Sequence, residues 1–311
     1  MKRVVESEWL LHFPNLKKVK VRGCKKMVEI IGRPPPCMPV DTALLDVSSF
    51  QKLELLEIIE GENLQVLCGA VDEQEVINGH SYSLSFPCLK KLNIQRCLKL
   101  KYLFGHGCKL SLPDLRVIII YGCKEIEGIT AAAAGSLLPA FPSLEEIDVA
   151  SCGNMKRVVE YEWLLHFPNL KKIKVWGCKK MVEIIGRPPP CMPVDTAVLD
   201  VSPLPKLELL EIVEGENFQV LFGAADEQEV INEHSYSLLF PCLKKLNIQR
   251  CLKLKYLFGH GCKLFFPDLQ AIVIKGCEEI EGITAAAAGS LLPAFPSLET
   301  INVESCGNMK G

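Results

Sequence analysis

The chain has 311 residues and nearly balanced charge, with Lys+Arg 35 against Asp+Glu 37 and a formal net charge of −2. This balance argues against a protein that binds nucleic-acid phosphates, because such proteins usually carry a basic excess. The longest apolar run, Ala131 to Phe141, is broken by Gly135, Ser136 and Pro139, so no membrane span is predicted. The N-terminal MKRVVESEWLLHF is too charged for a secretory signal peptide, and a cytoplasmic protein is expected.

Short apolar motifs of one kind recur along the chain and define its predicted elements. In FPNLKKIKVWGC (Phe167–Cys178), Leu170, Ile173 and Val175 keep the spacing L-x-x-L-x-L, and Cys178 follows. Side chains of a strand alternate between two faces, so the L-x-L part predicts a strand. In chain order the ten motifs begin at Leu16, Leu53, Leu89, Leu115, Leu144, Leu170, Leu207, Leu243, Leu269 and Leu298.

The repetition of so short a strand predicts the fold class. One such strand cannot bury its apolar side chains alone, whereas many strands stacked side by side can. We therefore predict an α/β fold, a right-handed leucine-rich-repeat solenoid or horseshoe. Its single parallel β-sheet would line the concave face, with loops and short helices on the convex face.

A period of 154 residues is superimposed on the short one. MKRVVESEWLLHFPNLKK from Met1 returns as MKRVVEYEWLLHFPNLKK from Met155, and the register then holds to Asn308. About 23 of the 154 aligned positions differ. We expect one repeat domain, 1–311, with about ten repeats in tandem copies 1–154 and 155–308.

The segments between strands carry three distinctive stretches. The proline-rich Gly32–Val40 predicts an extended spacer, because proline favours neither helix nor ladder hydrogen bonds. The polar, acidic Val71–Ser85 predicts a solvated loop. Thr130–Gly135, TAAAAG, predicts one helical turn with Thr130 as its N-cap. The first two stretches recur at Gly186–Val194 and Ala225–Leu239.

Cysteine usage predicts buried thiols. There are 15 cysteines, an odd number without any C-x-x-C pair, so neither a disulfide framework nor a structural zinc site is expected. Eight of them share one repeat position: Cys24, Cys97, Cys123, Cys152, Cys178, Cys251, Cys277 and Cys306. We expect these to be buried, reduced and metal-free, because a thiol packs as a small apolar group.

No group of residues predicts catalysis. His106 and Cys108 lie near Cys97 in sequence, but the paired short spacings of zinc ligands are missing. Reactive cysteines sit in accessible, electropositive surroundings, so packed cysteines are the simpler interpretation. We expect no enzyme activity, no metal and no cofactor.

At this level of detail the chain resembles a known family. The pattern L-x-x-L-x-L-x-x-C-x-x-[LIM], preceded by Phe-Pro, and runs such as CLKLKYLFG (Cys97–Gly105) are similar to the leucine-rich repeats of plant intracellular disease resistance proteins. The resemblance is to the nucleotide-binding members with an N-terminal coiled coil. Those proteins carry a phosphate-binding G-x-x-x-x-G-K-[ST] loop, which is missing from this chain. In two repeats the cysteine of the pattern is replaced by glycine, at Gly61 and Gly215.

The resemblance implies a protein-recognition module. Its partner would be a pathogen effector, a guarded host protein or the nucleotide-binding domain of a parent receptor, and neither nucleic acid nor a membrane span is implied. The alternative is a leucine-rich-repeat scaffold without an immune role.

The charges of the predicted sheet have two interpretations. Lysines and arginines of one strand stand beside acids of the next, so lateral pairing can explain them without a ligand. An example is the predicted strand with Glu145, Glu146 and Asp148 beside the one with Lys171, Lys172 and Lys174. However, about nine of the 23 differences between copies fall at the 25 exposed strand positions, and about 14 fall at the other 129. Since repeat proteins bind along the sheet, this favours a recognition surface. The candidate binding residues are Arg22, Arg116, Tyr121, Glu146, Asp148, Trp176, Gln270, Lys275, Asn302 and Glu304.

The two ends of the chain carry a further expectation. Met1 and Met309 stand at the same phase of the long period, so the chain begins and ends within a repeat. The strands around Leu16 and Leu298 would then expose apolar side chains. We expect the isolated chain to self-associate, and flanking native sequence to prevent this.

Overall fold

The computed structural model describes residues 3–5, 13–31, 50–71, 82–131, 141–186, 204–224, 236–285 and 294–307. Almost all regular structure there is parallel β-strand, with one 3₁₀ helix, η3 (Tyr161–His166). Each of the ten predicted motifs forms a strand that starts two residues after its first leucine. These strands are β2 (Lys18–Arg22), β4 (Leu55–Ile59), β7 (Lys91–Gln95), β10 (Val117–Tyr121), β12 (Glu146–Ala150), β13 (Lys172–Trp176), β14 (Leu209–Val213), β17 (Lys245–Gln249), β20 (Ala271–Lys275) and β22 (Thr300–Glu304).

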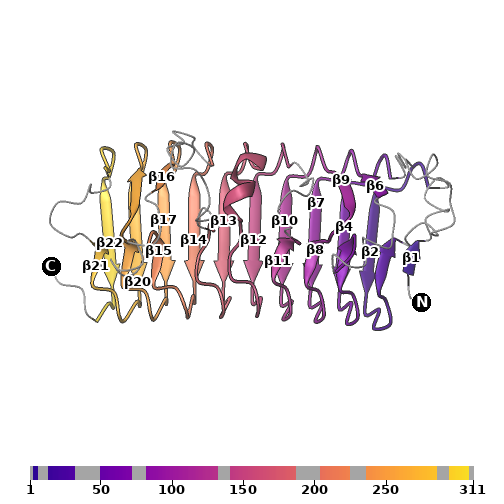
Figure 1. Ribbon diagram of the computed structural model, residues 1–311, viewed down its shortest axis with the longest axis horizontal. Coiled ribbons are helices and arrows are strands. Elements are labelled where there is room, and N and C mark those ends of the chain that lie inside the picture. The colour runs from indigo at the N-terminus through magenta and orange to yellow at the C-terminus, as the bar shows by residue number, and fades with distance from the viewer. Residues whose placement is uncertain are drawn as a thin grey trace. The chain divides into compact units, whose positions relative to one another are not determined.

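The chain divides into two compact units. Unit 1 comprises Met1–Leu144 with Ser151–Met155, and unit 2 comprises Glu145–Ala150 with Lys156–Gly311. In unit 1 the strands follow the order β2-β4-β7-β10, and in unit 2 the order β12-β13-β14-β17-β20-β22 (Figure 1). Within each unit the main sheet is parallel, as the repeat pattern predicts.

Strand pairing is in register, so each repeat position forms a row across the sheet. Ile147 pairs with Ile173 and Val149 with Val175, and all four side chains are buried. The residues between them, such as Asp148 in β12, point to the opposite side of the sheet. We call that opposite side the sheet face.

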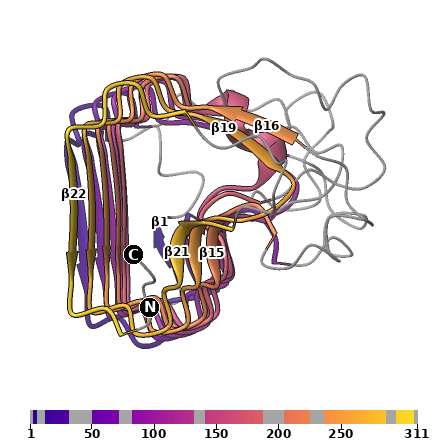
Figure 2. The same cartoon turned by 90° about the vertical axis from the view of Figure 1, so that its left-hand side faces the viewer.

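Short strands, rather than the predicted helical returns, form a second layer in each unit. In unit 2 this layer, with β15 and β21, lies across the interior from β22 (Figure 2). The three-stranded layers are β5 (Val66–Cys68), β8 (Tyr102–Phe104) and β11 (Gly128–Thr130) in unit 1, and β15 (Val220–Phe222), β18 (Tyr256–Phe258) and β21 (Gly282–Thr284) in unit 2. Two-stranded pairs are β1 (Arg3–Val5) with β3 (Glu29–Ile31), β6 (Tyr82–Ser85) with β9 (Cys108–Ser111), and β16 (Tyr236–Leu239) with β19 (Cys262–Phe265).

The predictions for the connecting segments were tested only in part. Thr130 is the last residue of strand β11 and pairs with Phe104 of β8, while the helical turn predicted after it falls on residues that are not described. The end of the predicted Val71–Ser85 loop is strand β6, where Leu84 is buried, and Ala225–Leu239 likewise ends in β16. Alternating Tyr-x-Leu residues after a polar run were the missed strand signal. The spacers 32–40 and 187–194, the segment 132–135 and the loops 72–81 and 225–235 lie outside the described residues.

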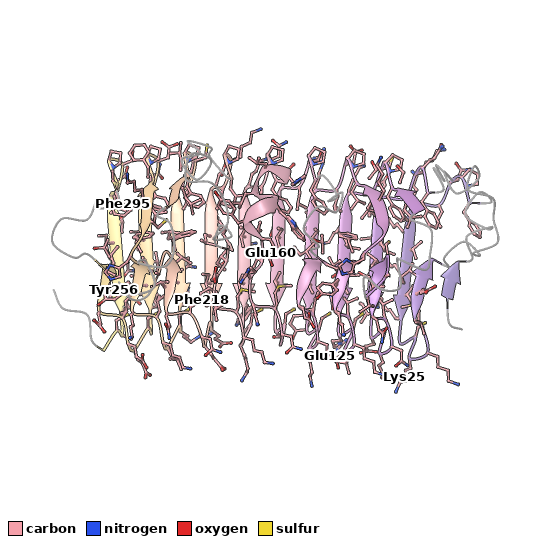
Figure 3. All side chains as sticks on the ribbon, in the orientation of Figure 1. Lys25, Glu125, Glu160, Phe218, Tyr256 and Phe295 are labelled. Atoms are coloured by element: carbon pink, nitrogen blue, oxygen red, sulfur yellow. The ribbon has the colours of Figure 1, made fainter. Side chains whose placement is uncertain are left out.

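Phenylalanine fills the space between the layers. Phe141, Phe167, Phe240 and Phe266, which stand before the Pro of a strand entry, are buried. In unit 2, Phe240 and Phe266 belong to a larger aromatic cluster, in which Phe266 stacks on Phe240 at 5.4 Å and on Phe295 at 5.7 Å between ring centroids. Phe295 and Tyr256 mark this part of unit 2 in Figure 3.

At the end of each of the ten main-sheet strands, the chain turns at a residue in the left-handed backbone conformation. Its φ lies between 53° and 66°, and its position directly precedes the cysteine position. These residues are Gly23, Glu60, Arg96, Gly122, Ser151, Gly177, Glu214, Arg250, Gly276 and Ser305. Lys25 and Glu125 follow such corners and are exposed (Figure 3). Six of the ten positions carry a non-glycine residue, which makes the corner a conformationally costly feature of the repeat.

The cysteines after these corners are free thiols, and most are buried. Cys97, Cys123, Cys152, Cys178, Cys251 and Cys277 are buried, whereas Cys24 and Cys306 are only half-buried. The prediction was therefore wrong for the first and last members, whose strands β2 and β22 pair on one side only among the described residues. Seven of the eight thiols donate to the carbonyl two residues earlier, for example Cys97 Sγ to Gln95 O at 3.6 Å. A small donor at this position thus serves both packing and hydrogen bonding.

Candidate binding face of the sheet

The predicted binding residues lie on or beside the sheet face, but the structure does not bring all of them together. Arg22, Arg116 and Tyr121 belong to unit 1, and Glu146, Asp148, Trp176, Gln270, Lys275, Asn302 and Glu304 belong to unit 2. Arg22, Tyr121 and Trp176 are exposed, as predicted, while Lys275 is half-buried. Their inward neighbours Val21, Ile120, Val175 and Ile274 are buried, which confirms the alternation expected from the sequence.

Glu57 is the centre of a polar network on unit 1. Its carboxylate accepts a hydrogen bond from Arg22 Nη2 at 3.0 Å and lies 3.6 Å from Lys20 Nζ. Asn93 Nδ2 donates to its other oxygen at 3.1 Å, and Gln95 Nε2 donates to Asn93 Oδ1. The Arg22 hydrogen bond, chiefly, lowers the pKa of Glu57 below its usual value, so the carboxylate is charged at neutral pH.

An acidic group faces outward from β12 to β14 in unit 2. Lys174 Nζ pairs with Glu146 Oε1 at 2.8 Å, and this hydrogen bond raises the pKa of Lys174. Asp148 and Glu211 flank Lys174 in the same row of the sheet. Burial is the main cause that raises the pKa of Asp148. The positive charge of Lys174 opposes this shift, and the negative charges of Glu146 and Glu211 add to it. One lysine therefore stands among three carboxylates.

Trp176 is the most prominent aromatic side chain of the sheet face. It is 55% exposed at the end of β13, where Ala150 and Val213 are its neighbours in the row. Its Nε1 donates to Glu214 Oε2 at 3.0 Å. Arg250 Nη2 pairs with the other oxygen of Glu214 at 2.9 Å. The indole is therefore fixed at its polar edge while most of its apolar surface faces solvent.

The remaining candidates form smaller groups. In β20 and β22, Lys275 Nζ pairs with Glu304 Oε2 at 2.9 Å, and Asn302 Nδ2 donates to Glu304 Oε1. Both hydrogen bonds lower the pKa of Glu304, and the one from Lys275 has the larger effect. Arg116 and Gln270 are exposed before the starts of β10 and β20, and the Gln270 carbonyl accepts the backbone N–H groups of Glu299 and Thr300.

Lateral charge pairing, one of the two interpretations of the sequence, is confirmed on both units. Besides the pairs above, opposite charges of neighbouring strands meet in Lys90–Glu54, Arg96–Glu60, Lys171–Glu145 and Lys244–Glu208 at 2.9–3.7 Å. Most of these side chains are about half exposed, and such pairs contribute roughly 0–1 kcal/mol each. Because the charged side chains pair with one another, the aromatic and amide side chains are the more distinctive features of the sheet face.

Sequence reasoning missed two buried asparagines on this face. Asn93 and Asn247 occupy the same row in the two copies, and each donates to the glutamate of the preceding strand, Glu57 or Glu211. They are 7% and 8% exposed. An available signal was the central Asn of KLNIQRC, a polar residue flanked by the two inward-facing apolar positions in both copies.

Within the ranges that the structure describes, no three His, Cys, Asp or Glu side chains form a group suited to holding a metal ion. The same ranges contain no helix that is long and apolar enough to cross a bilayer.

Comparison with known proteins agrees with the repeat pattern. Residues 165–307 match the family model of leucine-rich repeats of RPS2-like plant disease resistance proteins. Over these residues the chain is similar to the repeats of plant disease resistance proteins. The first copy, outside that match, shares all but about 23 of its 154 positions with the second.

Two curated relatives from Arabidopsis thaliana carry the same description. The chain is 27% identical over 215 residues to Probable disease resistance protein At1g12290, covering 68% of this chain and 21% of the relative. It is also 27% identical over 228 residues to Disease resistance protein RPS5, covering 69% of this chain and 22% of the relative. The chain thus spans about a fifth of the length of these disease resistance proteins, and it resembles their leucine-rich-repeat region.

Proposed function

We propose that this leucine-rich-repeat chain recognises protein ligands in plant immunity, as the sensing part of an intracellular disease resistance protein. Its ligand would be a pathogen effector or a host protein that effectors modify. In a longer receptor the same repeats would also restrain a nucleotide-binding domain until the ligand binds. The protein acts by binding rather than catalysis, in the cytoplasm.

The observation that carries the proposal is the exposed indole of Trp176. Tryptophan on a surface is a typical anchor of protein interfaces, because it buries a large area at a small cost in conformational entropy. The bond to Glu214 fixes the ring before any ligand arrives, which lowers that cost further.

Divergence between the copies supports the same face. The residue equivalent to Trp176 is Arg22, and that equivalent to Tyr121 is Lys275. The buried side chains beneath them are unchanged or nearly so, with Val21 and Val175 identical. Packing has been kept while the exposed chemistry of the face has changed, as expected of a surface under selection for recognition.

The experiment screens the chain against secreted pathogen proteins and leaf proteins by two-hybrid assay, then titrates each purified ligand by calorimetry. We expect Trp176→Ala to weaken binding about tenfold or more, equivalent to about 1.4 kcal/mol. Leu165→Ala is the matched control, because Leu165 is an exposed apolar residue of η3 away from the sheet face. The control should bind as the wild type does.

A second readout separates the immune role from scaffolding. The chain, fused behind a nucleotide-binding region of the receptor family, is expressed in leaves together with the ligand. We expect cell death with the wild type and its loss with Trp176→Ala. Binding that depends on Trp176 without cell death would favour the scaffold, and a ligand indifferent to Trp176 would contradict a sensing role for this face.

A further inference from the structure

We propose that the protein ligand of the sheet face presents an arginine, whose guanidinium would bind Glu211 and stack on the indole of Trp176. This inference rests on the proposed function, because it names the chemistry of the ligand that the sheet face would recognise. In unit 1 an arginine of the chain itself holds the equivalent place.

The first observation is the contact between an arginine and a carboxylate in unit 1. Arg22 of β2 donates through Nη2 to Oε1 of Glu57 on the neighbouring strand, at 3.0 Å. Lys20 Nζ lies 3.6 Å from the same oxygen. Asn93 Nδ2 donates to the other oxygen at 3.1 Å. Two cations and one amide thus surround this carboxylate, whose side chain is only 12% exposed.

The second observation is that the equivalent carboxylate of unit 2, Glu211, has kept the amide donor but has no ion pair. Asn247 Nδ2 donates to Glu211 Oε1, as the equivalent asparagine does in unit 1. The equivalent lysine, Lys174, pairs instead with Glu146 at 2.8 Å. The equivalent of the arginine is Trp176. Among the residues that the structure describes, Glu211 consequently forms no ion pair.

The third observation is the position of the indole that replaces the arginine. Trp176 pairs with Val213 in the register of β13 and β14, and Glu211 lies two residues before Val213. The indole and this carboxylate therefore stand in adjacent rows on neighbouring strands. The ring is 55% exposed, and its Nε1 is already bound to Glu214. A planar guanidinium can stack on the face of such a ring while its N–H groups donate to a carboxylate.

Asp148 places a second carboxylate near the indole. Ala150 pairs with Trp176 in the register of β12 and β13, and Asp148 lies two residues before Ala150. Within the described part of the chain, Asp148 also forms no ion pair. Since three carboxylates stand around one lysine here, this part of the face carries a net negative charge. Charge complementarity therefore favours a cationic side chain of the ligand over an acidic or a purely apolar one.

The test uses peptides as probes and the whole chain as the receptor. A phage library of random peptides is selected on the immobilised wild type, and the binders are compared on Trp176→Arg, which restores the residue of the first copy. We expect the peptides that bind only the wild type to contain arginine, because the introduced guanidinium would occupy Glu211 itself. Binders that depend on Trp176 but contain no arginine would overturn the proposal.

A neutral isostere tests the arginine without any change to the protein. One selected peptide is synthesised with arginine, with citrulline, which has nearly the same shape but no charge, and with lysine. Calorimetry should show that citrulline weakens binding about tenfold or more, because a charged hydrogen bond is lost. Equal affinities of the arginine and citrulline peptides would overturn the proposal. A lysine peptide that binds as tightly as the arginine peptide would do so too, because an ammonium cannot reproduce a stacked, bidentate contact.

Variants of the chain identify the carboxylate that binds the guanidinium. Glu211→Gln should weaken binding of the arginine peptide about tenfold and that of the citrulline peptide less than about twofold, since coupled groups are not additive. Equal losses with the two peptides would contradict a contact with Glu211. Asp148→Asn should weaken the arginine peptide several-fold, and asparagine stands at the equivalent position of β22. The matched control is Glu57→Gln in unit 1, which should leave both affinities unchanged.

The arginine site and the proposed function fail on different results. Ligands that depend on Trp176 but tolerate citrulline would overturn the arginine site and leave recognition by the sheet face intact. A library without any binder that depends on Trp176 would overturn the arginine site as well. The ligands found by two-hybrid assay then decide the proposed function independently.

Discussion

Trp176, at the end of β13, and Arg250, at the corner after β17, share the carboxylate of Glu214, which lies at the corner after β14. Trp176 Nε1 and Arg250 Nη2 lie 3.0 and 2.9 Å from the two oxygens of Glu214. In unit 1 Arg22 occupies the position of Trp176, but it donates a hydrogen bond to Glu57. Glu60, the equivalent of Glu214, forms its ion pair with Arg96. A single substitution between the copies therefore redirects the hydrogen bonds of the sheet face.

Glu57 is expected to contribute more to stability than its neighbours do. Its side chain is 12% exposed and accepts hydrogen bonds from Arg22 and Asn93. Glu57→Gln should lower the free energy of unfolding by about 1–2 kcal/mol, because charged hydrogen bonds to a partly buried group are lost. The control Glu54→Gln, whose side chain is 40% exposed and 3.7 Å from Lys90, should cost less than about 0.5 kcal/mol. Urea denaturation measures both, and equal losses would contradict the network.

The contribution of Glu57 should depend on pH. The pKa of this carboxyl is lowered in the folded protein, from a usual value of 4.5. Its stabilisation is complete above the unfolded pKa and is lost as the pH falls through the folded pKa. The difference in free energy of unfolding between the wild type and Glu57→Gln should therefore decrease from about pH 7 to about pH 3. An increase of this difference on acidification would show that the pKa of Glu57 is raised on folding.

Gly61 and Gly215 should respond differently to one substitution. A Cβ at Gly61 would lie 3.2 Å from Met27 Cε and 3.3 Å from Cys97 Sγ, both adaptable side-chain atoms. A Cβ at Gly215 would overlap the ring of Phe218, which replaces Leu64. Gly215→Ala should cost about 1–3 kcal/mol more than Gly61→Ala, because overpacking forces the ring to move. Thermal unfolding of the two variants is the measurement, and Gly215→Ala with Phe218→Leu should remove the excess.

The corner after each strand should favour glycine. Gly276 has φ of 62°, and an added Cβ would meet only Arg250 at 3.5 Å or more. Gly276→Ala should therefore destabilise by about 1 kcal/mol through backbone strain alone. Ser151 has φ of 53°, and Ser151→Gly should stabilise by a few tenths of a kcal/mol up to about 1 kcal/mol. Chemical denaturation checks both signs, and destabilisation of both variants would argue against corner strain.

Alkylation should distinguish the end cysteines from the inner ones. The hydrogen bond with Cys97 and burial raise the pKa of Cys123, and the bond with Cys277 and burial do the same for Cys251. Neutral, buried thiols react slowly, so iodoacetamide should label them only on unfolding. Cys24 and Cys306, which are half-buried, should react faster in the native protein. Peptide mass spectrometry over time measures the rates, and uniform rates would contradict this order.

The sequence by itself determined the long strands, their inward and outward side chains and the cysteine corner. Local patterns suffice there because alternation along a strand fixes which side chains point the same way. Val175 and Trp176 illustrate this, since the one was expected to be buried and the other exposed, and both are. The pattern of opposite charges on neighbouring strands also predicted lateral pairing, and Lys171 and Glu145 pair in this way at 2.9 Å. The register places Glu146 beside Lys172, so the Lys174–Glu146 contact was decided by the structure.

Only the tertiary structure decided the second layer, the polar network and the ends. Thr130 becomes part of a strand because β8 offers it a partner, which local alanine-rich sequence does not reveal. Asn93 becomes a buried donor because Glu57 lies beside it on a strand 36 residues away. Val149 and Val303 have almost the same local sequence, yet one is fully buried and the other 36% exposed. Burial in a repeat array depends on the neighbour, and the neighbour is set by the fold rather than by the motif.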